Sequence, residues 1–448
     1  MSATPSSTDP IPDPVHEPGG PLTLTLVAAI TGAITGAASL SFALLLRRSD
    51  HVRDDLMHWA HHHHTPGFVV LAVVIAAAVS TAALLVHRVE PHAEGSGIPR
   101  VEAIVEGRAE PGRLRILPVK YAGGLLAIGS GLALGREGPS VQMGGVIATV
   151  CGRLGRLRGD ELRMVIAGGA AAGLATAFNA PIAGGVFVLE ELYKRFDHRA
   201  TLATLTASGA GFAVTHLLHP EGTVFVVPTL PDPDLHRAPL ILAVGLVCAL
   251  VAIVYNRAIM AALRFVDVTR IPVTVRAIVI GLGVALLAWF LPSWVGSGDN
   301  LTQRALSGHG AIGAVVALIA CRFALGVVSY AANTPGGLFA PMLVLGSQTG
   351  LAVALTLGRA FSLTPAMLSG LALTGLVAFF TASVQAPVTG LILATEMTGS
   401  VSWLPPMLGA AAIALLTARA LRSEPIYDAL TARSARNALI NLKAEAGG

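Results

Sequence analysis

The five residues GREGP at positions 135–139 interrupt an apolar part of the chain, and a matching break, GLFAP, occurs at positions 337–341. A second pair of matched breaks lies downstream, NAPIAG at 179–184 and QAPVTG at 385–390, and each runs on to a glutamate. The members of the two pairs are 202 and 206 residues apart, so one short insertion reconciles them. Two ordered matches with the same proline and glycine spacing predict an internal duplication.

Each break places glycines ahead of a proline in the expected first turn of a helix, and GSGIP at residues 95–99 has the same form. Proline suits that turn because the missing N–H would have no partner there, and glycine lets another group approach the backbone. The free N–H groups and the positive end of the helix dipole favour an anion, whereas a sodium or potassium site needs oxygen ligands. The alternative is that these residues only pack helices and start them.

The composition points to a membrane protein. The 448 residues are 53% hydrophobic and 12% charged, and the mean hydropathy is +0.69. Soluble proteins carry about 25% charged residues, so soluble globular, disordered and nucleic-acid-binding classes are excluded. The net charge of +4 fits a protein that faces anionic lipid. Three widely spaced cysteines, Cys151, Cys248 and Cys321, provide neither a disulfide framework nor a metal-binding spacing.

Apolar segments of two kinds are present. Four are long enough to cross a bilayer: Leu22–Leu46, Gly67–Val86, Pro239–Phe265 and Val273–Leu291. The regions 119–193 and 311–420 are instead cut by glycine and proline into pieces that we expect to be too short to span. Irregular backbone is tolerated in a membrane only where protein or water satisfies it, and broken helices are typical of transport sites. The sequence therefore predicts an all-α polytopic membrane protein with a ligand site between its halves.

The domain organisation follows from the same pattern. We expect a disordered N-terminal tail at residues 1–20, which has no basic start of a signal peptide. A membrane transport domain follows at 21–430, with repeat halves of roughly 21–220 and 235–430, and then a short cytoplasmic C-terminal tail at 431–448. Charge leaves the orientation open, because two basic clusters compete: Arg100, Arg108, Arg113 and Arg115 against Arg153, Arg156, Arg158 and Arg163.

Four motifs in this order resemble the CLC family of chloride channels and transporters: GSGIP at 95–99, GREGP at 135–139, GGLFAP at 336–341 and EPIY at 424–427. The resemblance covers about residues 22–430. It implies the CLC fold, two inverted-topology repeats of tilted and broken helices, in a homodimer whose subunits each have an anion pathway. It also implies chloride and protons as transported ions, no cofactor or metal, and a multi-pass location in the cell membrane, in a bacterium the inner membrane.

The resemblance implies a central anion site and an outer one. The central site takes the hydroxyls of Ser96 and Tyr427 and the backbone N–H groups of Leu338 and Phe339. The outer site takes the backbone around Glu137, namely Gly135, Arg136 and Gly138. Serine at position 96 goes with chloride in the family and proline with nitrate, so we expect chloride. The alternatives are a helix N-cap for Ser96 and an interfacial anchor for Tyr427.

Two glutamates are candidates for proton transfer. A carboxylate at a helix start is favoured by the dipole, but in an anion site it also competes with the anion, and the resemblance assigns this gating role to Glu137. Glu191 matches the family's internal proton-transfer glutamate, where passive channels usually lack a carboxylate, and so favours a chloride/proton antiporter over a passive chloride channel. Its neighbour Glu190 is either a second way-station or the mark of a helix end. A carboxylate in a membrane is by default a functional candidate.

Other polar residues are candidates for supporting or structural roles. Glu102 and Lys120 match a glutamate–lysine pair of the family and could give electrostatic support. Arg136 could attract chloride at the pore mouth or snorkel to the surface, and Glu396 is expected to be structural. The histidines at 61–64 resemble a metal or pH sensor, but a solvated loop is the simpler interpretation.

Two other classes of membrane protein fit less well. An intramembrane serine protease would need a G-x-S-G spacing, which the contexts of Ser96, Ser130 and Ser297 lack, so we expect no enzyme. An aquaporin-like pore would need two N-P-A boxes, and the N-A-P and Q-A-P breaks do not provide them.

Overall fold

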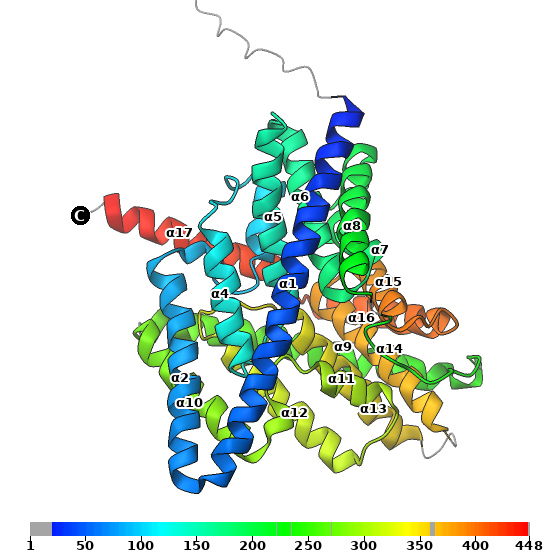
Figure 1. The fold of residues 1–448 in the computed structure, drawn as a ribbon. Coiled ribbons are helices and arrows are strands. Elements are labelled where there is room, and N and C mark those ends of the chain that lie inside the picture. Colours follow the sequence, from blue (N-terminus) through cyan, green and yellow to red (C-terminus); the bar gives the residue numbers. More distant parts are fainter. Residues whose placement is uncertain (1–19, 221, 234, 270, 359–362, 447–448) are drawn as a thin grey trace, which may run out of the picture.

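The structure is a computed structural model that describes residues 20–220, 222–233, 235–269, 271–358 and 363–446. The expected tail at 1–20 lies outside the described residues except for Gly20, as do residues 447–448 of the expected C-terminal tail. The described backbone is almost entirely helical (Figure 1). Nine of the described helices are long and apolar enough to cross a membrane. The predicted all-α polytopic class is confirmed.

The helices of the first half are α1 (Pro21–His62), α2 (His64–Arg88), α3 (Ile98–Val105), α4 (Ile116–Gly129), α5 (Glu137–Leu154), α6 (Gly159–Phe178), α7 (Pro181–Phe187) and α8 (His198–Leu218). Those of the second half are α9 (Ala238–Thr269), α10 (Val273–Phe290), α11 (Asp299–Leu306), α12 (Ile312–Tyr330), α13 (Phe339–Leu357), α14 (Pro365–Val384), α15 (Pro387–Thr398), α16 (Leu404–Ala420) and α17 (Ile426–Ala446). Helix α17 therefore crosses the boundary that we expected at residue 430.

The four long apolar segments lie in α1, α2, α9 and α10, as predicted. Helix α1 does not end near Leu46 but continues to His62. Its polar second part stays helical because Arg53 pairs with Asp50 at 2.6 Å and with Asp54 at 3.1 Å. The histidines at 61–64 consequently lie at the ends of α1 and α2, exposed to solvent, and not in a loop as expected.

The expectation that every piece of the broken regions is too short to span is wrong for α12 and α13, which have 19 residues each, and for α6 and α14, which have 20. Helices α6 and α14 are buried on almost all sides, and 89% of the apolar window of α14 is covered by protein. By contrast, only 33% of the corresponding window is covered in α8, α10 and α12. These three helices expose the apolar side chains that a lipid environment would cover.

The duplication is visible in the backbone. Asn179 ends α6 and Gln385 ends α14, each in the left-handed region with φ of 52° and 65°. Pro181 and Pro387 then begin α7 and α15 at the first position. From the centre of Figure 1, α5 rises towards one end of the molecule and α13 descends towards the other. The matched helices run in opposite directions, so the repeats have inverted topology.

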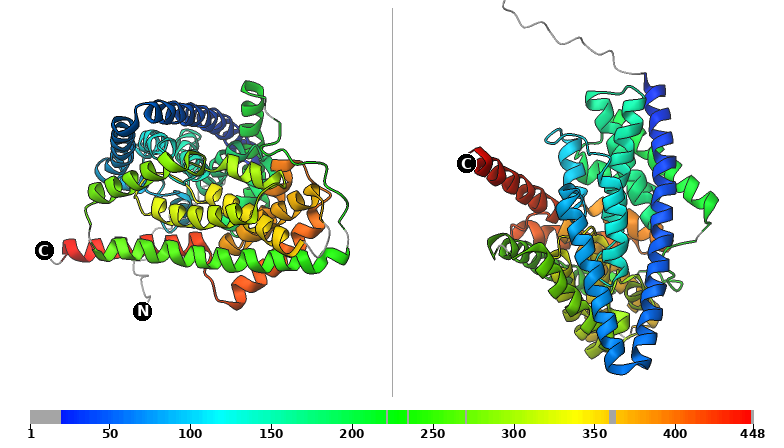
Figure 2. Two further views of the ribbon diagram at one scale, coloured as in Figure 1. Left: turned by 90° about the horizontal axis from the view of Figure 1, so that it is seen from below. Right: turned by 60° about the vertical axis from the view of Figure 1, so that its left-hand side comes forward.

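The last helix closes one side of the molecule. Figure 2 shows α17 lying alongside the long helix α9. Arg433 of α17 pairs with Asp267 at the end of α9 at 2.7 Å, and also with Glu94, just before the GSGIP motif, at 3.4 Å. These ion pairs attach α17 to the end of α9 and to the segment ahead of the GSGIP motif.

Helix α5 packs so closely on α6 that a side chain cannot be added at the contact. A Cβ atom on Gly169 would lie 2.3 Å from the carbonyl oxygen of Gly144. Gly169→Ala should lower the free energy of unfolding by about 1–3 kcal/mol, measured as thermal unfolding in detergent. The matched control is Gly209→Ala on the exposed side of α8, where a Cβ meets no atom within 4 Å. Equal stability of the two variants would contradict the close packing.

Candidate functional site

The glycine loops ahead of α3, α5 and α13 are joined by backbone hydrogen bonds. Gly135 N–H donates to the Gly337 carbonyl at 2.8 Å, and Gly337 N–H donates back to Gly135 at 2.7 Å. Gly95 N–H donates to Thr334 at 3.1 Å, and Gly336 N–H donates to Gly95 at 2.9 Å. Loops from both halves of the chain thus form one unit, from which three helices start.

The motif glycines are needed for this approach. A Cβ on Gly138 would lie 2.7 Å from both Cβ and the carbonyl oxygen of Ser96. A Cβ on Gly337 would lie 2.9 Å from the backbone nitrogen of Gly138. Gly97, at φ +79°, also has the left-handed conformation that glycine adopts most easily. The first turn of α5 therefore touches the residue that precedes α3, and both helix starts have N–H groups without an intrahelical partner.

The expected central-site residues are all buried. Ser96, Leu338, Phe339 and Tyr427 have no exposed surface. The ring centroids of Tyr427 and Phe339 are 6.2 Å apart, and the Tyr427 hydroxyl has no hydrogen-bond partner among the described residues. Ser96 Oγ accepts a hydrogen bond from Ile98 N–H at 3.3 Å, but the N-cap of α3 is Gly97, so Ser96 is not the helix N-cap that the sequence left open.

Tyr330 belongs to the same region, although the sequence gave no sign of it. It ends α12 and is 8% exposed. Its hydroxyl contacts Ser96 and lies 2.9 Å from where a Cβ of Gly95 would be. Tyr330 was missed because it ends an apolar helix and lies in no motif.

Glu137 is the first residue of α5 and only 3% exposed. Its carboxylate faces its own backbone N–H and that of Ala340 in the first turn of α13. One oxygen, Oε2, has no hydrogen-bond partner among the described residues. A charge-bearing side chain thus lies between two helix starts that would otherwise be open to an anion.

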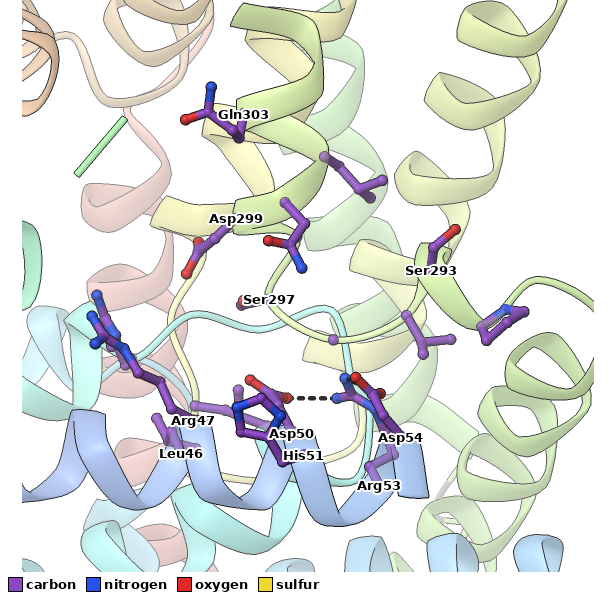
Figure 3. A pocket seen from close by; sticks show the side chains of 18 of the residues that line it. Leu46, Arg47, Asp50, His51, Arg53, Asp54, Ser293, Ser297, Asp299 and Gln303 are labelled. Atoms are coloured by element: carbon purple, nitrogen blue, oxygen red, sulfur yellow. Dashed lines mark hydrogen bonds and ion pairs between the residues drawn. The ribbon is translucent and has the colours of Figure 1, made fainter. Parts of the chain in front are cut away.

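A cavity of about 950 Å³ reaches Glu137 from the end of the molecule where α1 and α2 meet. The second part of α1 forms one wall and residues 292–304 form another, as Figure 3 shows for Asp50, Arg53 and Asp299. Arg136 lines this cavity and donates to the Ala177 carbonyl at 3.0 Å. Arg136 thus lies on the cavity wall, and its guanidinium is held by a backbone carbonyl of α6.

Glu191 lies in a turn of π-helix, Val188–Leu192, that follows α7. It is 5% exposed, and its Oε1 has no hydrogen-bond partner among the described residues. π-Helical turns are rare and occur frequently at functional sites, so the local backbone agrees with the candidate role of this residue.

The adjacent Glu190 turns away from Glu191 and caps a helix of the other repeat. Its carboxylate accepts hydrogen bonds from the N–H groups of Val388 at 3.1 Å and Thr389 at 2.7 Å, at the start of α15. Glu190 is therefore engaged with α15 in this structure.

Glu396 makes the reciprocal contact, which accounts for the structural role expected of it. Its carboxylate accepts hydrogen bonds from the N–H groups of Ile182 at 3.0 Å and Ala183 at 2.7 Å, at the start of α7. Glu190 and Glu396 thus tie the two repeats together by the same interaction in both directions.

The expected pair between Glu102 and Lys120 is not formed, and this interpretation needs correction. The buried Lys120 ammonium donates instead to the carbonyls of Gly95 at 2.7 Å and Ala93 at 3.1 Å. Glu102 pairs with Lys194 at 2.8 Å. Lys120 thus donates hydrogen bonds to the backbone carbonyls ahead of Ser96. Glu102 instead forms its ion pair with Lys194, which is at the surface.

The histidines at the hairpin make contacts with neighbouring aromatic residues. The His61 ring stacks on Trp289 with centroids 4.2 Å apart, and His63 stacks on Trp59 at 4.3 Å. Within the described ranges, no three histidine, cysteine or acidic side chains are placed to hold a metal ion.

Comparison with known proteins gives consistent results. The family model described as voltage gated chloride channel matches residues 77–419. The H(+)/Cl(−) exchange transporter ClcA of Vibrio cholerae serotype O1 (strain M66-2) is 34% identical over 363 residues, which cover 79% of this chain and 77% of that protein. ClcA of Vibrio parahaemolyticus serotype O3:K6 is 33% identical over 360 residues, with the same coverage.

Solved structures share the fold. A slow cyanobacterial Cl⁻/H⁺ antiporter superposes with a TM-score of 0.87 at 27% identity, covering 92% of this chain and 98% of that one. A eukaryotic CLC transporter superposes with a TM-score of 0.79 at 20% identity, covering 92% of this chain and 74% of that one, which is a likeness of fold alone.

The hydrogen bonds from the start of α7 to Glu396 predict that removing this carboxylate lowers the stability of the protein. Glu396→Ala leaves two N–H groups of α7 without an acceptor and should lower the free energy of unfolding by about 0.5–2 kcal/mol. Thermal unfolding in detergent would measure it, with Glu424→Ala at an exposed position as the control. Glu396→Gln keeps one acceptor oxygen, so its stability should lie between that of Glu396→Ala and that of the control. Unchanged stability of the alanine variant would show that the contact contributes nothing.

Proposed function

This chain belongs to the voltage-gated chloride channel family, and we propose that it is an antiporter that exchanges chloride for protons across the membrane. The observation that carries the proposal is the position of Glu137. Its buried carboxylate lies between the first turns of α5 and α13 and borders a cavity that opens at one end of the molecule. A group in that place can exclude an anion while it is charged and bind a proton when it moves away.

Chloride is the anion that the surroundings favour. Ser96 and Tyr427 contribute hydroxyl groups, and the start of α13 contributes the N–H groups of Leu338 and Phe339. None of these donors carries a full charge, so a chloride ion is stabilised by dipoles and can still leave. The outer site uses the backbone of Gly135, Arg136 and Gly138 while Glu137 is displaced.

Proton transfer would use Glu137 and Glu191 in turn. Protonation neutralises Glu137, weakens its attraction to the helix starts and opens the anion path. Glu191 is buried at the far side of the centre and keeps an oxygen free of hydrogen bonds, as a proton carrier requires. A passive channel needs no such second carboxylate, and this supports antiport. The transport cycle needs no cofactor and no enzymatic step.

The orientation follows from the basic residues. The Arg163 side chain lies against Gly107, where a Cβ would be 2.7 Å from its guanidinium carbon. The loop between α3 and α4 therefore lies beside the start of α6, and these segments, which belong to the two competing arginine clusters, are at the opposite end from the α1–α2 hairpin (Figure 1). Since basic residues concentrate on the cytoplasmic side, we propose that the face at this end is cytoplasmic and that the cavity at Glu137 opens to the outside.

We also propose a homodimer in the bacterial inner membrane. Glu190 and Glu396 join α7 to α15, and each of these helices exposes an apolar side chain: Ile182 (54%) on α7 and Val388 (44%) on α15. Helix α7 packs on α8 and α15 packs on α16, which also expose apolar side chains. A second copy of this chain could cover this apolar surface. Single-molecule photobleaching of labelled protein in bilayers would contradict the dimer if only one step were seen.

Flux measurements test the antiport. The purified protein would be reconstituted in liposomes with a chloride gradient, and external pH would be followed while a potassium ionophore holds the voltage at zero. We expect chloride-driven proton pumping. Glu137→Gln and Glu191→Gln should each abolish proton movement but leave chloride flux, and Glu424→Gln should change neither. Chloride flux without proton pumping in the natural sequence would identify a passive channel, and pumping by Glu137→Gln would contradict the role of that residue.

Labelling tests the orientation. In a variant without the three native cysteines, His63→Cys at the hairpin should react with a membrane-impermeant maleimide added to intact cells. Arg158→Cys, on the basic face, should react only after the membrane is permeabilised. Both positions are exposed, so the opposite result would reverse the orientation.

A further inference from the structure

One lysine joins two carboxylates from distant helices at the cytoplasmic face proposed above. The Lys194 ammonium lies 2.8 Å from Glu102 Oε1 of α3 and 2.7 Å from Asp428 Oδ1 of α17. Glu102 is almost fully buried, with 1% of its side chain exposed, and its other oxygen accepts a hydrogen bond from Thr431 at 2.9 Å. The cluster thus links three segments that are far apart in the sequence.

Each of these three segments carries one residue of the proposed transport site. Helix α3 begins two residues after Ser96. Lys194 follows Glu191 by three residues, directly after the π-helical turn. Asp428 is the neighbour of Tyr427 in the first turn of α17. The positions of the chloride-binding hydroxyls and of the proton-transfer carboxylate are therefore connected through one ammonium group.

The backbone at Lys194 depends on these contacts. Its φ of 53° lies in the left-handed region, which costs free energy for a residue with a side chain. Burial disfavours the charged form of Lys194, but hydrogen bonds to Asp428 and Glu102 outweigh this effect and raise the pKa of the ammonium group. Lys194 therefore stays charged at neutral pH, and the chain turn that follows Glu191 is held by the two close ion pairs and by a third, longer one to Glu106 at 3.9 Å.

The neighbouring cation, Arg108, cannot replace Lys194. Arg108 approaches Glu102 only to 3.7 Å and is already engaged with Glu106. Without Lys194, the buried Glu102 carboxylate and the Asp428 carboxylate would face each other, and Arg108 would be their only cationic neighbour among the described residues. Because like charges repel, we expect α3 and α17 to move apart. Glu102 is the buried member of the cluster, with 1% of its side chain exposed against 39% for Lys194. Removing Lys194 therefore leaves a buried charge without its partner, which is destabilising.

We propose that Lys194 is a positioning residue for the exchange, which holds Glu191 and Tyr427 in the relative placement that links proton transfer to chloride movement. This role rests on the antiport proposed above. When the link is lost, α17 and the turn after Glu191 move independently, and chloride passes without its proton. In the liposome assay this loss would appear as a lower number of protons moved per chloride ion. A variant that only folds less well would leave that number unchanged.

The test compares three single variants in the liposome assay. Misplacement by about 1 Å can reduce a rate by up to about 100-fold, so Lys194→Met should lower proton pumping by about tenfold and leave most of the chloride flux. Lys194→Arg retains the charge and should restore most of the pumping. The control is Arg195→Met, at the exposed neighbouring position, which should behave as the natural sequence. Equal proton-to-chloride ratios for Lys194→Met and Arg195→Met would overturn the proposal.

A double variant separates position from stability. Lys194→Met combined with Glu102→Gln removes the uncompensated buried charge and should recover thermal stability in detergent, but the three segments stay unlinked and the ratio stays low. Recovery of the ratio together with stability would show that the lysine only balances charge, and would also overturn the proposal. Absence of pumping in the natural sequence would instead refute antiport itself.

Discussion

The two hydrogen bonds between Gly135 and Gly337 are the contact on which the rest of the site depends. They join a loop of the first repeat to a loop of the second at the centre of the fold, and only residues without side chains can approach so closely. As a result, the starts of α3, α5 and α13 face one small region. Their dipoles can hold an anion there without a charged side chain as its direct ligand, and this weak attraction permits release as well as binding.

Inverted repeats give the two halves similar backbones but different chemistry. Glu137 of α5 corresponds in the repeat to Phe339 of α13, and Glu191 corresponds to Met397. Glu190 and Glu396, by contrast, are preserved as a pair, and each caps a helix of the opposite repeat. The duplicated residues thus maintain the architecture. The two carboxylates proposed to carry protons occur only in the first half, and the second half supplies an aromatic wall and backbone N–H groups.

Buried polar groups fall into two kinds. Lys120 donates to the carbonyls ahead of Ser96, and Arg322 donates to the carbonyls of Gly296 and Ser297 in the wall of the outer cavity. These charges hold backbone in place. Glu137, Glu191 and Tyr427 each keep an atom without a partner among the described residues. A buried polar atom without a partner is costly, and in the transport proposed above a chloride ion or a proton supplies the missing interaction at these three residues.

The sequence by itself determined the membrane class, the long apolar helices, the duplication and the glycine–proline helix starts, because each depends on composition or on neighbouring residues. It also placed Ser96, Glu137 and Tyr427 in motifs. The tertiary structure alone decided that Glu102 pairs with Lys194 and not with Lys120, that Tyr330 reaches Ser96, and that the loop after α3 lies against Arg163. Such contacts join residues tens to hundreds of positions apart. Their geometry is set by how closely the helices pack, and no local pattern of residues encodes that distance.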